Sequence, residues 1–377
     1  MNINSLCIHG GNKNNNPVGA VSVPIYQSAT FSHIGVGKST GYDYSRLSNP
    51  TRTELETIMA QLEYGYDALA FSTGMAATTA MMELFSPGDH IIASDDIYGG
   101  SYRLFCNISN KNGIIVEFVN TSNIDEVKNA IRKETKAIFV ETPTNPMMKV
   151  SDIARLSEIT KEHNLLFIVD NTFLTPYFMN PILLGANIVV HSGTKYLCGH
   201  NDTLAGILVV DSEELSEKLR FIFKTTGACL SPFDSWLLIR GIKTLGIRMV
   251  KQQENALKVA EWLKSHPKIK KVNYVGLPTN PEFELSKKQA RGFGAMISFE
   301  TDTNHTAMQL LERVEMVLYA ESLGGVESLI TYPMLQTHAD IPKEEREKKG
   351  IHECLLRLSV GIEDVQDIIN DLNQALN

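Results

Sequence analysis

The sequence contains few cysteines, and they form no pattern. Its 377 residues include five, an odd number without a CxxC pair, at positions 7, 106, 198, 229 and 354. A disulfide framework or a zinc site needs paired or closely spaced cysteines. The scatter argues against both, so we expect no metal site and a reducing, cytoplasmic location.

Long apolar runs and an excess of positive charge are also missing. No run approaches the roughly 18 residues of a membrane-spanning helix. The polar start MNINSLCIHGGNKNNNPVG lacks the apolar core of a secretory signal. The formal net charge is −8, which provides no basic footprint for nucleic acid. We therefore expect a protein that neither enters membranes nor binds nucleic acid.

The remaining composition is that of an ordinary globular protein, with 43% apolar and 21% charged residues. The length predicts two domains, which we place at residues 61–245 and 246–377. Residues 1–60 differ, because they are rich in Asn, Pro and Gly and have little helical period before Thr53. Such a segment is expected to wrap a neighbouring subunit rather than to build a core of its own.

Short apolar runs alternate with stretches of helical length between residues 68 and 210. The runs are continuously apolar, as in strands buried on both faces, and span 68–74, 90–94, 114–120, 137–142, 165–171, 188–193 and 205–210. Helical stretches lie at 75–85, 123–133 and 152–163. This alternation predicts an α/β fold with a mostly parallel sheet and helices on both faces.

The C-terminal part has its own alternation. A helical stretch at 235–263 is followed by strand-like runs near 271–275 and 295–300, and the chain ends in a helix-like stretch at 363–376. These runs predict a smaller C-terminal α/β domain.

The stretch HSGTKYLCGH (191–200) contains the most informative residue, Lys195, just past an apolar strand and flanked by Ser192 and Thr194. A lysine at a strand end is either a solvated side chain or a nucleophile that forms a Schiff base with an aldehyde cofactor. Asp170 favours the second interpretation, because it ends the preceding apolar strand. Enzymes that use pyridoxal 5′-phosphate (PLP) pair such a lysine with an aspartate at the pyridine nitrogen.

Other residues could complete a site at the carboxyl ends of the strands, where ligands of parallel sheets bind. Gly74 and Met75 open a helix after a strand, and a helix N-terminus can hold a phosphate. Tyr98 is either a core tyrosine or a ring that stacks on a pyridine. Asn145 in ETPTNP could meet a ring hydroxyl.

Two arginines need anionic partners. Arg46, with Tyr44, lies too early in the chain to belong to the sheet, so its position suggests that it reaches the phosphate of another subunit's cofactor. Arg357 lies in an apolar strand and needs either a salt bridge or a substrate carboxylate.

The stretch GVGKST (35–40) imitates a nucleotide-binding loop. The full pattern needs a glycine where Ser32 stands, and no strand–loop–helix unit surrounds it. We therefore do not expect nucleoside triphosphate binding there.

Between residues 42 and 364 the motifs YDYSR-x-x-NPTR, SxGMAA, DDxYGGSYR, ETPTNP, DNTF, HSGTKYLxGHND, AESLGGVESL and LLRLSVGIED follow one another. In this order they resemble the Cys/Met-metabolism family of PLP-dependent enzymes. That family includes cystathionine γ-synthases, cystathionine γ- and β-lyases, methionine γ-lyases and O-acylhomoserine sulfhydrylases. The resemblance implies a PLP fold-type I, aminotransferase-like architecture and a homotetramer built from two intimate dimers with shared active sites.

The resemblance also implies roles for matching residues. Lys195 would bind PLP and later move protons, Asp170 would pair with the pyridine nitrogen, and Tyr98 would stack on the ring, so these three are the expected catalytic residues. The phosphate would be held by Gly74, Met75, Ser192 and Thr194, joined by Tyr44 and Arg46 of the partner subunit. The other expected cofactor contacts are Thr172 and Asn145.

The amino-acid substrate would be bound by a second set of residues. Arg357, with Ser322 and Asn145, would take its α-carboxylate. Glu321 would receive a distal ammonium group and Arg103 a distal carboxylate. Gly100 stands where methionine γ-lyases usually carry Cys, which argues against that activity, whereas Thr142 in place of the usual Ser is a minor departure.

Within the family, AESLGG, GHND and SPFDSWLLIRGIKTL look most like bacterial γ-synthases, whereas KEEREKKGI also occurs in β-lyases. The leading expectation is a PLP-dependent transferase that joins an O-acylhomoserine and cysteine into cystathionine, in trans-sulfuration and methionine biosynthesis. The acyl group stays open between acetyl and succinyl. Alternatives are cystathionine γ-lyase, then β-lyase, or an O-acetylhomoserine sulfhydrylase. A PLP-binding relative without catalysis is the rival from another class.

Overall fold

The first domain is built on a seven-stranded sheet of order β1-β7-β6-β5-β4-β2-β3. All neighbours pair in parallel except β7, which runs antiparallel to both β1 and β6. The computed structural model describes residues 1–11, 18–339 and 341–377. The strands are β1 (Asp67–Phe71), β2 (His90–Ser94), β3 (Ile115–Val119), β4 (Thr135–Glu141), β5 (Leu166–Asp170), β6 (Ile188–Ser192) and β7 (Gly206–Val210). Each expected apolar run therefore overlaps a strand, although β1 and β4 begin one and two residues before their runs.

The side chains of these strands alternate between two apolar cores, because successive residues of a strand point to opposite faces. In β1, Leu69 and Phe71 enter one core and Ala68 and Ala70 the other. One core is covered by α3 (Gly74–Met82), α4 (Gly99–Arg103), the π-helix η1 (Leu104–Ser109) and α8 (Glu213–Thr226). Helices on both faces of a mostly parallel sheet confirm the predicted α/β class.

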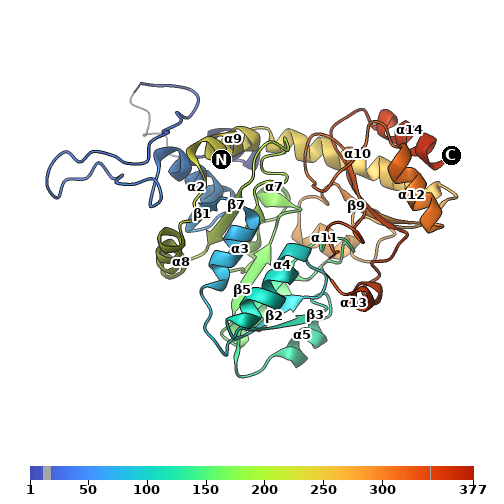
Figure 1. Cartoon of the computed structure of the whole chain (residues 1–377), viewed down its shortest axis with the longest axis horizontal. Coiled ribbons are helices and arrows are strands. Elements are labelled where there is room, and N and C mark those ends of the chain that lie inside the picture. The colour runs from blue at the N-terminus through green and yellow to red at the C-terminus, as the bar shows by residue number, and fades with distance from the viewer. Residues whose placement is uncertain (12–17, 340) are drawn as a thin grey trace.

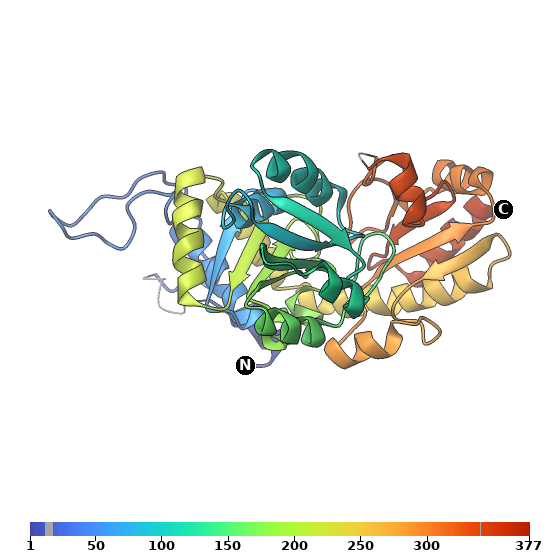
Figure 2. The same cartoon turned by 90° about the horizontal axis from the view of Figure 1, so that it is seen from below.

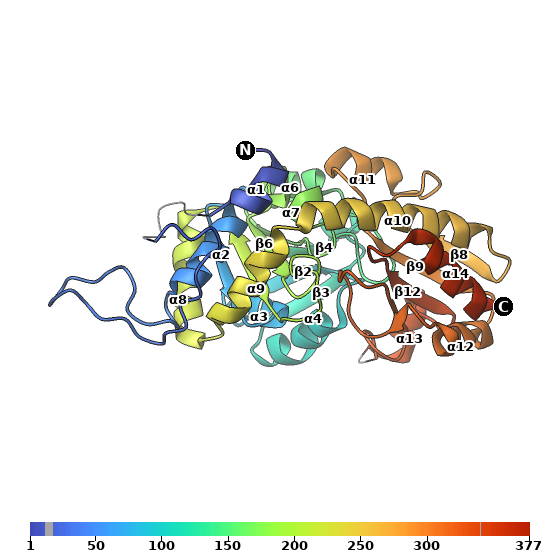
Figure 3. The same ribbon diagram turned by 90° about the horizontal axis from the view of Figure 1, so that it is seen from above.

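The helices on the other face form the larger core (Figures 1 and 2). They are α2 (Pro50–Glu63), α5 (Ile124–Ala130), α6 (Ile153–Glu162), α7 (Thr175–Phe178), the 3-10 helix η2 (Pro181–Leu184), α9 (Pro232–Ile242) and α10 (Leu245–Ser265). The helix α10 runs on into the C-terminal part, so both parts share this core (Figure 3).

The C-terminal part contains a five-stranded sheet of order β10-β11-β12-β9-β8, which confirms the smaller second α/β unit. Its strands are β8 (Ile269–Asn273), β9 (Met296–Thr301), β10 (Leu318–Tyr319), β11 (Leu329–Thr331) and β12 (Leu355–Ser359). Its helices are α11 (Phe283–Gln289), α12 (Asn304–Arg313), α13 (Lys343–Lys348) and α14 (Val365–Leu376).

The expected helical stretch 235–263 is two helices, separated at Lys243 and Thr244. Arg248 stabilises this break, because its guanidinium donates to the Gly241 carbonyl at 2.8 Å and to Thr244 Oγ1 at 3.0 Å. The second helix begins next to the expected domain boundary at 245/246. That boundary stays a prediction.

The N-terminal segment contains more helix than its composition suggested. A short helix, α1 (Ile3–His9), is capped by Asn2, and α2 begins at Pro50 after an Asn49 cap, earlier than the period suggested. Asparagine caps satisfy the free N–H groups of a helix start. Residues 12–17 of the predicted wrapping segment lie outside the described residues.

Residues 18–49 contain neither helix nor strand, and Figure 1 shows this loop leaving the body of the molecule. The GVGKST stretch lies here in a tight turn, in which Lys38 N donates to Gly35 O at 2.9 Å. A nucleotide-binding loop needs a strand before it and a helix after it, and neither adjoins this turn. None of the helices in the described ranges is long and apolar enough to cross a membrane.

Candidate active site

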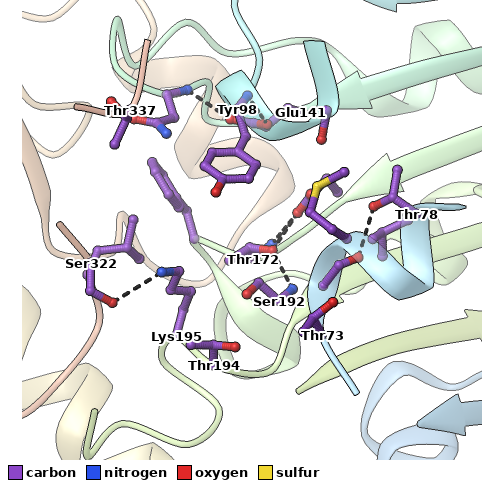
Figure 4. Close-up of a pocket in the computed structure, with 18 of the residues that line it drawn as sticks. Thr73, Thr78, Tyr98, Glu141, Thr172, Ser192, Thr194, Lys195, Ser322 and Thr337 are labelled. Carbon is purple, nitrogen blue, oxygen red and sulfur yellow. Dashed lines mark hydrogen bonds between the residues drawn. The ribbon is translucent and has the colours of Figure 1, made fainter. Parts of the chain in front are cut away.

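A cavity of about 280 Å³ lies at the carboxyl ends of β4, β5 and β6, and loops of the C-terminal sheet close it (Figure 4). It contains most of the residues predicted from the sequence. Those in its wall are Gly74, Met75, Tyr98, Asn145, Asp170, Thr172, Ser192, Thr194, Lys195, Glu321, Ser322 and Arg357. Three predicted residues, Tyr44, Arg46 and Arg103, are not in the wall.

Lys195 lies in a tight turn just after β6. Its Nζ donates to Ser322 Oγ at 3.1 Å, as Figure 4 shows. Arg248 stabilises this turn, because its guanidinium donates a hydrogen bond to the Tyr196 carbonyl oxygen at 2.6 Å. Burial and the nearby Arg357 lower the pKa of Lys195 to about 8, although Glu321 opposes the shift. A substantial fraction of this amine is therefore neutral, and hence nucleophilic, near pH 8.

Asp170, Thr172 and Ser192 form a hydrogen-bonded chain across the ends of β5 and β6. The Thr172 hydroxyl donates to Asp170 Oδ1 at 2.6 Å and accepts from Ser192 N at 2.9 Å. The Thr172 backbone N–H also donates to Oδ1, at 3.0 Å, so both bonds to this carboxylate in the described structure end at one oxygen. Burial raises the pKa of Asp170 despite these bonds. A cationic nitrogen beside the carboxylate would lower that pKa again.

The N-terminus of α3 faces the hydrogen-bonded residues Asp170, Thr172 and Ser192. Gly74 approaches β6 so closely that a Cβ added there would lie 3.1 Å from the Cβ of Ser192. The cap of α3, Thr73 Oγ1, accepts from Ala76 N at 2.9 Å. Helix geometry gives the first N–H groups, those of Gly74 and Met75, no acceptor within the helix. This arrangement offers free donors to an anion.

Glu141, at the end of β4, is a buried residue that the sequence reasoning did not select. Its Oε2 accepts from Tyr98 N at 2.9 Å and its Oε1 from Asn145 N at 3.0 Å. It is the register partner of Asp170 on the neighbouring strand, and burial together with that carboxylate raises its pKa. The available signal was its place, because it ends a buried strand as Asp170 does.

Arg357 in β12 is buried, with 1% of its surface exposed. Its guanidinium donates to Asn145 Oδ1 at 2.9 Å, to the Ser322 carbonyl at 2.9 Å and to Thr331 Oγ1 at 3.1 Å. Within the described ranges, Nε has no partner and no ion pair joins Arg357 to an acidic side chain. The structure thus decides against a salt bridge, and the buried cation points to an anionic ligand.

Arg103 was expected near the substrate but is not in the cavity wall. Its charge nevertheless acts on Tyr98 in that wall, because it opposes the rise in the pKa of Tyr98. The predicted role of Arg103 with a distal carboxylate stays a prediction. The exposed Glu321 does line the cavity.

The structure also keeps Tyr44 and Arg46 away from this chain's own cavity. The Arg46 guanidinium donates to the Lys224 carbonyl, and its carbon lies 5.6 Å from the centre of the Tyr44 ring. Their predicted contribution to a partner's site stays a prediction.

Comparison with known proteins identifies the family. The family model described as "Cys/Met metabolism PLP-dependent enzyme" matches residues 4–377. This chain belongs to that family. Its PLP fold-type I architecture and its cofactor, PLP, agree with the predictions from the motifs.

Several family members resemble the whole chain. A cystathionine γ-lyase of Bacillus subtilis is 50% identical over 376 residues, covering 100% of this chain and 99% of the relative. A cystathionine β-lyase of Lactococcus lactis is 50% identical, covering 99% and 98%. A cystathionine γ-synthase of Haemophilus influenzae is 47% identical, covering 99% and 97%. Their names include three different reactions, so identity alone does not choose among them.

A solved structure of cystathionine γ-lyase from Lactobacillus plantarum, complexed with L-serine, superposes on the chain with a TM-score of 0.97. It is 43% identical, and the match covers 100% of this chain and 98% of the other.

The cavity fits PLP on its own chemistry. The amine of Lys195, with its lowered pKa, suits an aldehyde. The half-buried Asp170 carboxylate, one oxygen of which accepts no hydrogen bond from the described residues, suits a pyridine nitrogen, and the free N–H groups at a helix start suit a phosphate. Lys195, Asp170 and the start of α3 supply these groups from three elements.

The pKa of Lys195 yields a testable pH dependence for cofactor uptake. Only the neutral amine attacks an aldehyde, so the rate at which cofactor-free protein takes up PLP should rise tenfold per pH unit below about 8. Above that pH it should level off, as followed by visible absorbance after mixing. Glu321→Gln should move the plateau to lower pH, because Glu321 raises this pKa. A rate that still climbs at pH 10 would contradict the assignment.

Asp170→Asn should leave the fold and much of the PLP binding intact while nearly abolishing turnover. An amide of similar volume preserves the packing, but it cannot keep a pyridine nitrogen protonated. We expect a loss on the order of 10²–10³ in kcat, typical of removing an electrostatic group that stabilises the transition state. The measurement is kcat of protein shown by absorbance to be PLP-loaded. Turnover within tenfold of the unmodified enzyme would remove Asp170 from this role.

Proposed function

We propose that this enzyme catalyses γ-replacement: it joins an O-acyl-L-homoserine and L-cysteine into cystathionine. The observation that supports this best is a pair of opposite charges in one cavity. Arg357 is buried in the wall and lacks an anion, whereas the Glu321 carboxylate is exposed. One residue suits the α-carboxylate of the first amino acid, and the other suits the ammonium group of a second.

PLP, when bound, withdraws electrons from the α-carbon of the amino acid attached to it. With PLP in the site, Lys195 Nζ would take the Cα proton of the substrate, and its 3.1 Å bond to Ser322 Oγ would keep it oriented. The γ-acyloxy group would leave as a carboxylate once a second proton is lost, from Cβ. The cysteine thiol would then bond to Cγ and give up its proton, and protons would return to Cβ and, from Lys195 Nζ, to Cα.

Arg357 and Asn145 would orient the substrate throughout. The bond of 2.9 Å between them fixes the guanidinium for a bidentate carboxylate. Burial and Glu321 raise the pKa of Tyr98, so its hydroxyl remains protonated and acts as a hydrogen-bond donor.

Cystathionine cleavage is the second candidate. The 50% identical relatives are named as a γ-lyase and a β-lyase. The same two charges would hold cystathionine, with its distal ammonium group at Glu321. A sulfhydrylase reaction, with sulfide in place of cysteine, would leave Glu321 without a ligand.

Steady-state assays distinguish these reactions. O-acetyl- and O-succinylhomoserine are each assayed with cysteine, and cystathionine is assayed alone. We expect the best kcat/KM with an acylhomoserine and cysteine, and we expect Glu321→Gln to raise KM for cysteine by about tenfold, since bonds to charged groups contribute about 1.5–3 kcal/mol. The KM for acylhomoserine should not change. A hundredfold preference for cystathionine cleavage would overturn the synthase proposal.

We also propose a cytoplasmic homotetramer in which two subunits of each intimate dimer share their sites. The extended segment 18–49, with exposed apolar residues such as Val21 and Val36, supports a role against another subunit. In this arrangement Tyr44 and Arg46 complete the phosphate site of the partner. All five cysteines are free, in keeping with a reducing compartment.

Complementation tests the shared site. Arg46→Ala and Lys195→Ala subunits are each expected to be inactive or to bind PLP weakly, and are mixed after dissociation and reassembly. Hybrid dimers should regain about one intact site, because one subunit supplies Lys195 and the other Arg46. The readout is activity per hybrid dimer, with each parent reassembled alone as the control. Verified hybrids without recovery would show that Arg46 does not act across the interface.

A further inference from the structure

A fully buried carboxylate lies behind the active site, on the opposite face of the sheet. Glu63, the last residue of α2, has 0% of its surface exposed. Its Oε1 accepts from His191 Nε2 at 2.7 Å and from Asn171 Nδ2 at 3.0 Å, and its Oε2 accepts from Asn180 Nδ2 at 3.2 Å. We call Glu63, Asn171 and His191 the rear clip.

The rear clip joins the same two strand ends that the hydrogen-bonded residues Asp170, Thr172 and Ser192 join on the cavity side. Asp170 and Ser192 line the cavity, so their neighbours Asn171 and His191 point to the other face, since side chains alternate along a strand. On the cavity side, Thr172 links Asp170 to Ser192. On the far side, Glu63 links Asn171 to His191. The ends of β5 and β6 are therefore joined on both faces.

Stability alone does not explain this cluster. The Glu63 carboxyl group and the His191 ring are hydrogen-bonded to each other, and both side chains are 0% exposed. Burying polar groups of this kind has a desolvation cost, so the cluster adds little net stability compared with apolar residues of similar volume. In the part of the chain that the structure describes, His191 Nδ1 and Asn171 Oδ1 are also buried without a partner. An arrangement with these disadvantages must do something that an apolar contact cannot, and directional hydrogen bonds fix geometry.

We propose that Glu63 and His191 are positioning residues for the reaction. By holding the ends of β5 and β6 from behind, they keep Asp170 and Ser192 in place for PLP. This inference rests on the proposed roles of Asp170 and Ser192 in PLP binding, and it is independent of which substrate the enzyme uses. Neither positioning residue is in the cavity wall. His191 acts through the adjoining Ser192 and through its charge interaction with Asp170, and Glu63 acts through its hydrogen bonds to Asn171 and His191.

Two substitutions at one position separate hydrogen bonding from bulk. His191→Gln keeps an N–H donor at a similar reach from Glu63, whereas His191→Leu keeps an apolar side chain and removes the donor. We expect the first variant to stay within about twofold of the unmodified enzyme. The second should weaken PLP binding and lower kcat by about 10–100-fold, because small displacements of a catalytic group are enough for such losses.

The measurements are the PLP dissociation constant, from visible absorbance, together with kcat, KM and Tm. Leu55→Ala is the control, because Leu55 is a fully buried core residue two turns earlier in α2. It should lower Tm while leaving PLP binding and kcat within about twofold at temperatures well below Tm. Glu63→Leu serves as a second variant should His191→Leu not fold: it removes the oxygen that accepts from both His191 and Asn171, so it should match the losses expected for His191→Leu.

Two results would overturn the proposal. One is that His191→Leu and Glu63→Leu bind PLP and turn over like Leu55→Ala, which would make the rear clip purely structural. The other is that His191→Gln is as damaged as His191→Leu, so that the retained donor is of no use. The PLP dissociation constant is measured without substrate, so failure of the γ-replacement proposal leaves this test intact.

Discussion

The hydrogen-bonded chain from Asp170 through Thr172 to Ser192 is the connection on which the site depends. It joins the ends of two neighbouring parallel strands, β5 and β6, and so sets the distance between the carboxylate and the start of the lysine turn. The parallel arrangement makes this possible, because it brings the ends of strands far apart in sequence to one edge. The burial of these strands on both faces leaves them little freedom to shift.

Around this connection, the two domains contribute different charged groups to the same cavity. The first domain provides the amine and the carboxylate, whereas the C-terminal sheet provides the buried cation of Arg357 in β12. Asn145 links them, since its backbone N–H is held by Glu141 and its side chain by Arg357. His338 adds a third bond, to the Asn145 carbonyl at 3.0 Å. The positions of the Arg357 guanidinium and of Asn145 are therefore set by residues of both domains.

Much of this could be predicted from the sequence. Continuous apolar runs located every strand of the first sheet, and the lysine motif located the site, because both depend on local sequence. Helix α1 was missed because it is short and depends on the Asn2 cap, and the break before α10 was missed because it depends on tertiary bonds from Arg248. Glu141 was missed although it ends a buried strand as Asp170 does, because the backbone N–H groups that it binds carry no sequence signature of their own. The predicted roles of Tyr44 and Arg46 involve a second subunit, which a single chain does not contain.

The guanidinium of Arg248 has a mechanical consequence. It binds the carbonyls of Tyr196 and Leu197, next to the lysine, and also the Gly241 carbonyl at the end of α9, while its own backbone belongs to α10. The long helix that carries the C-terminal domain is thus fastened directly to the turn that carries Lys195. A rotation of that domain about the break at Lys243 and Thr244 must either pull the lysine with it or break these bonds. As long as these bonds hold, the turn that carries Lys195 and the start of α10 form one mechanical unit.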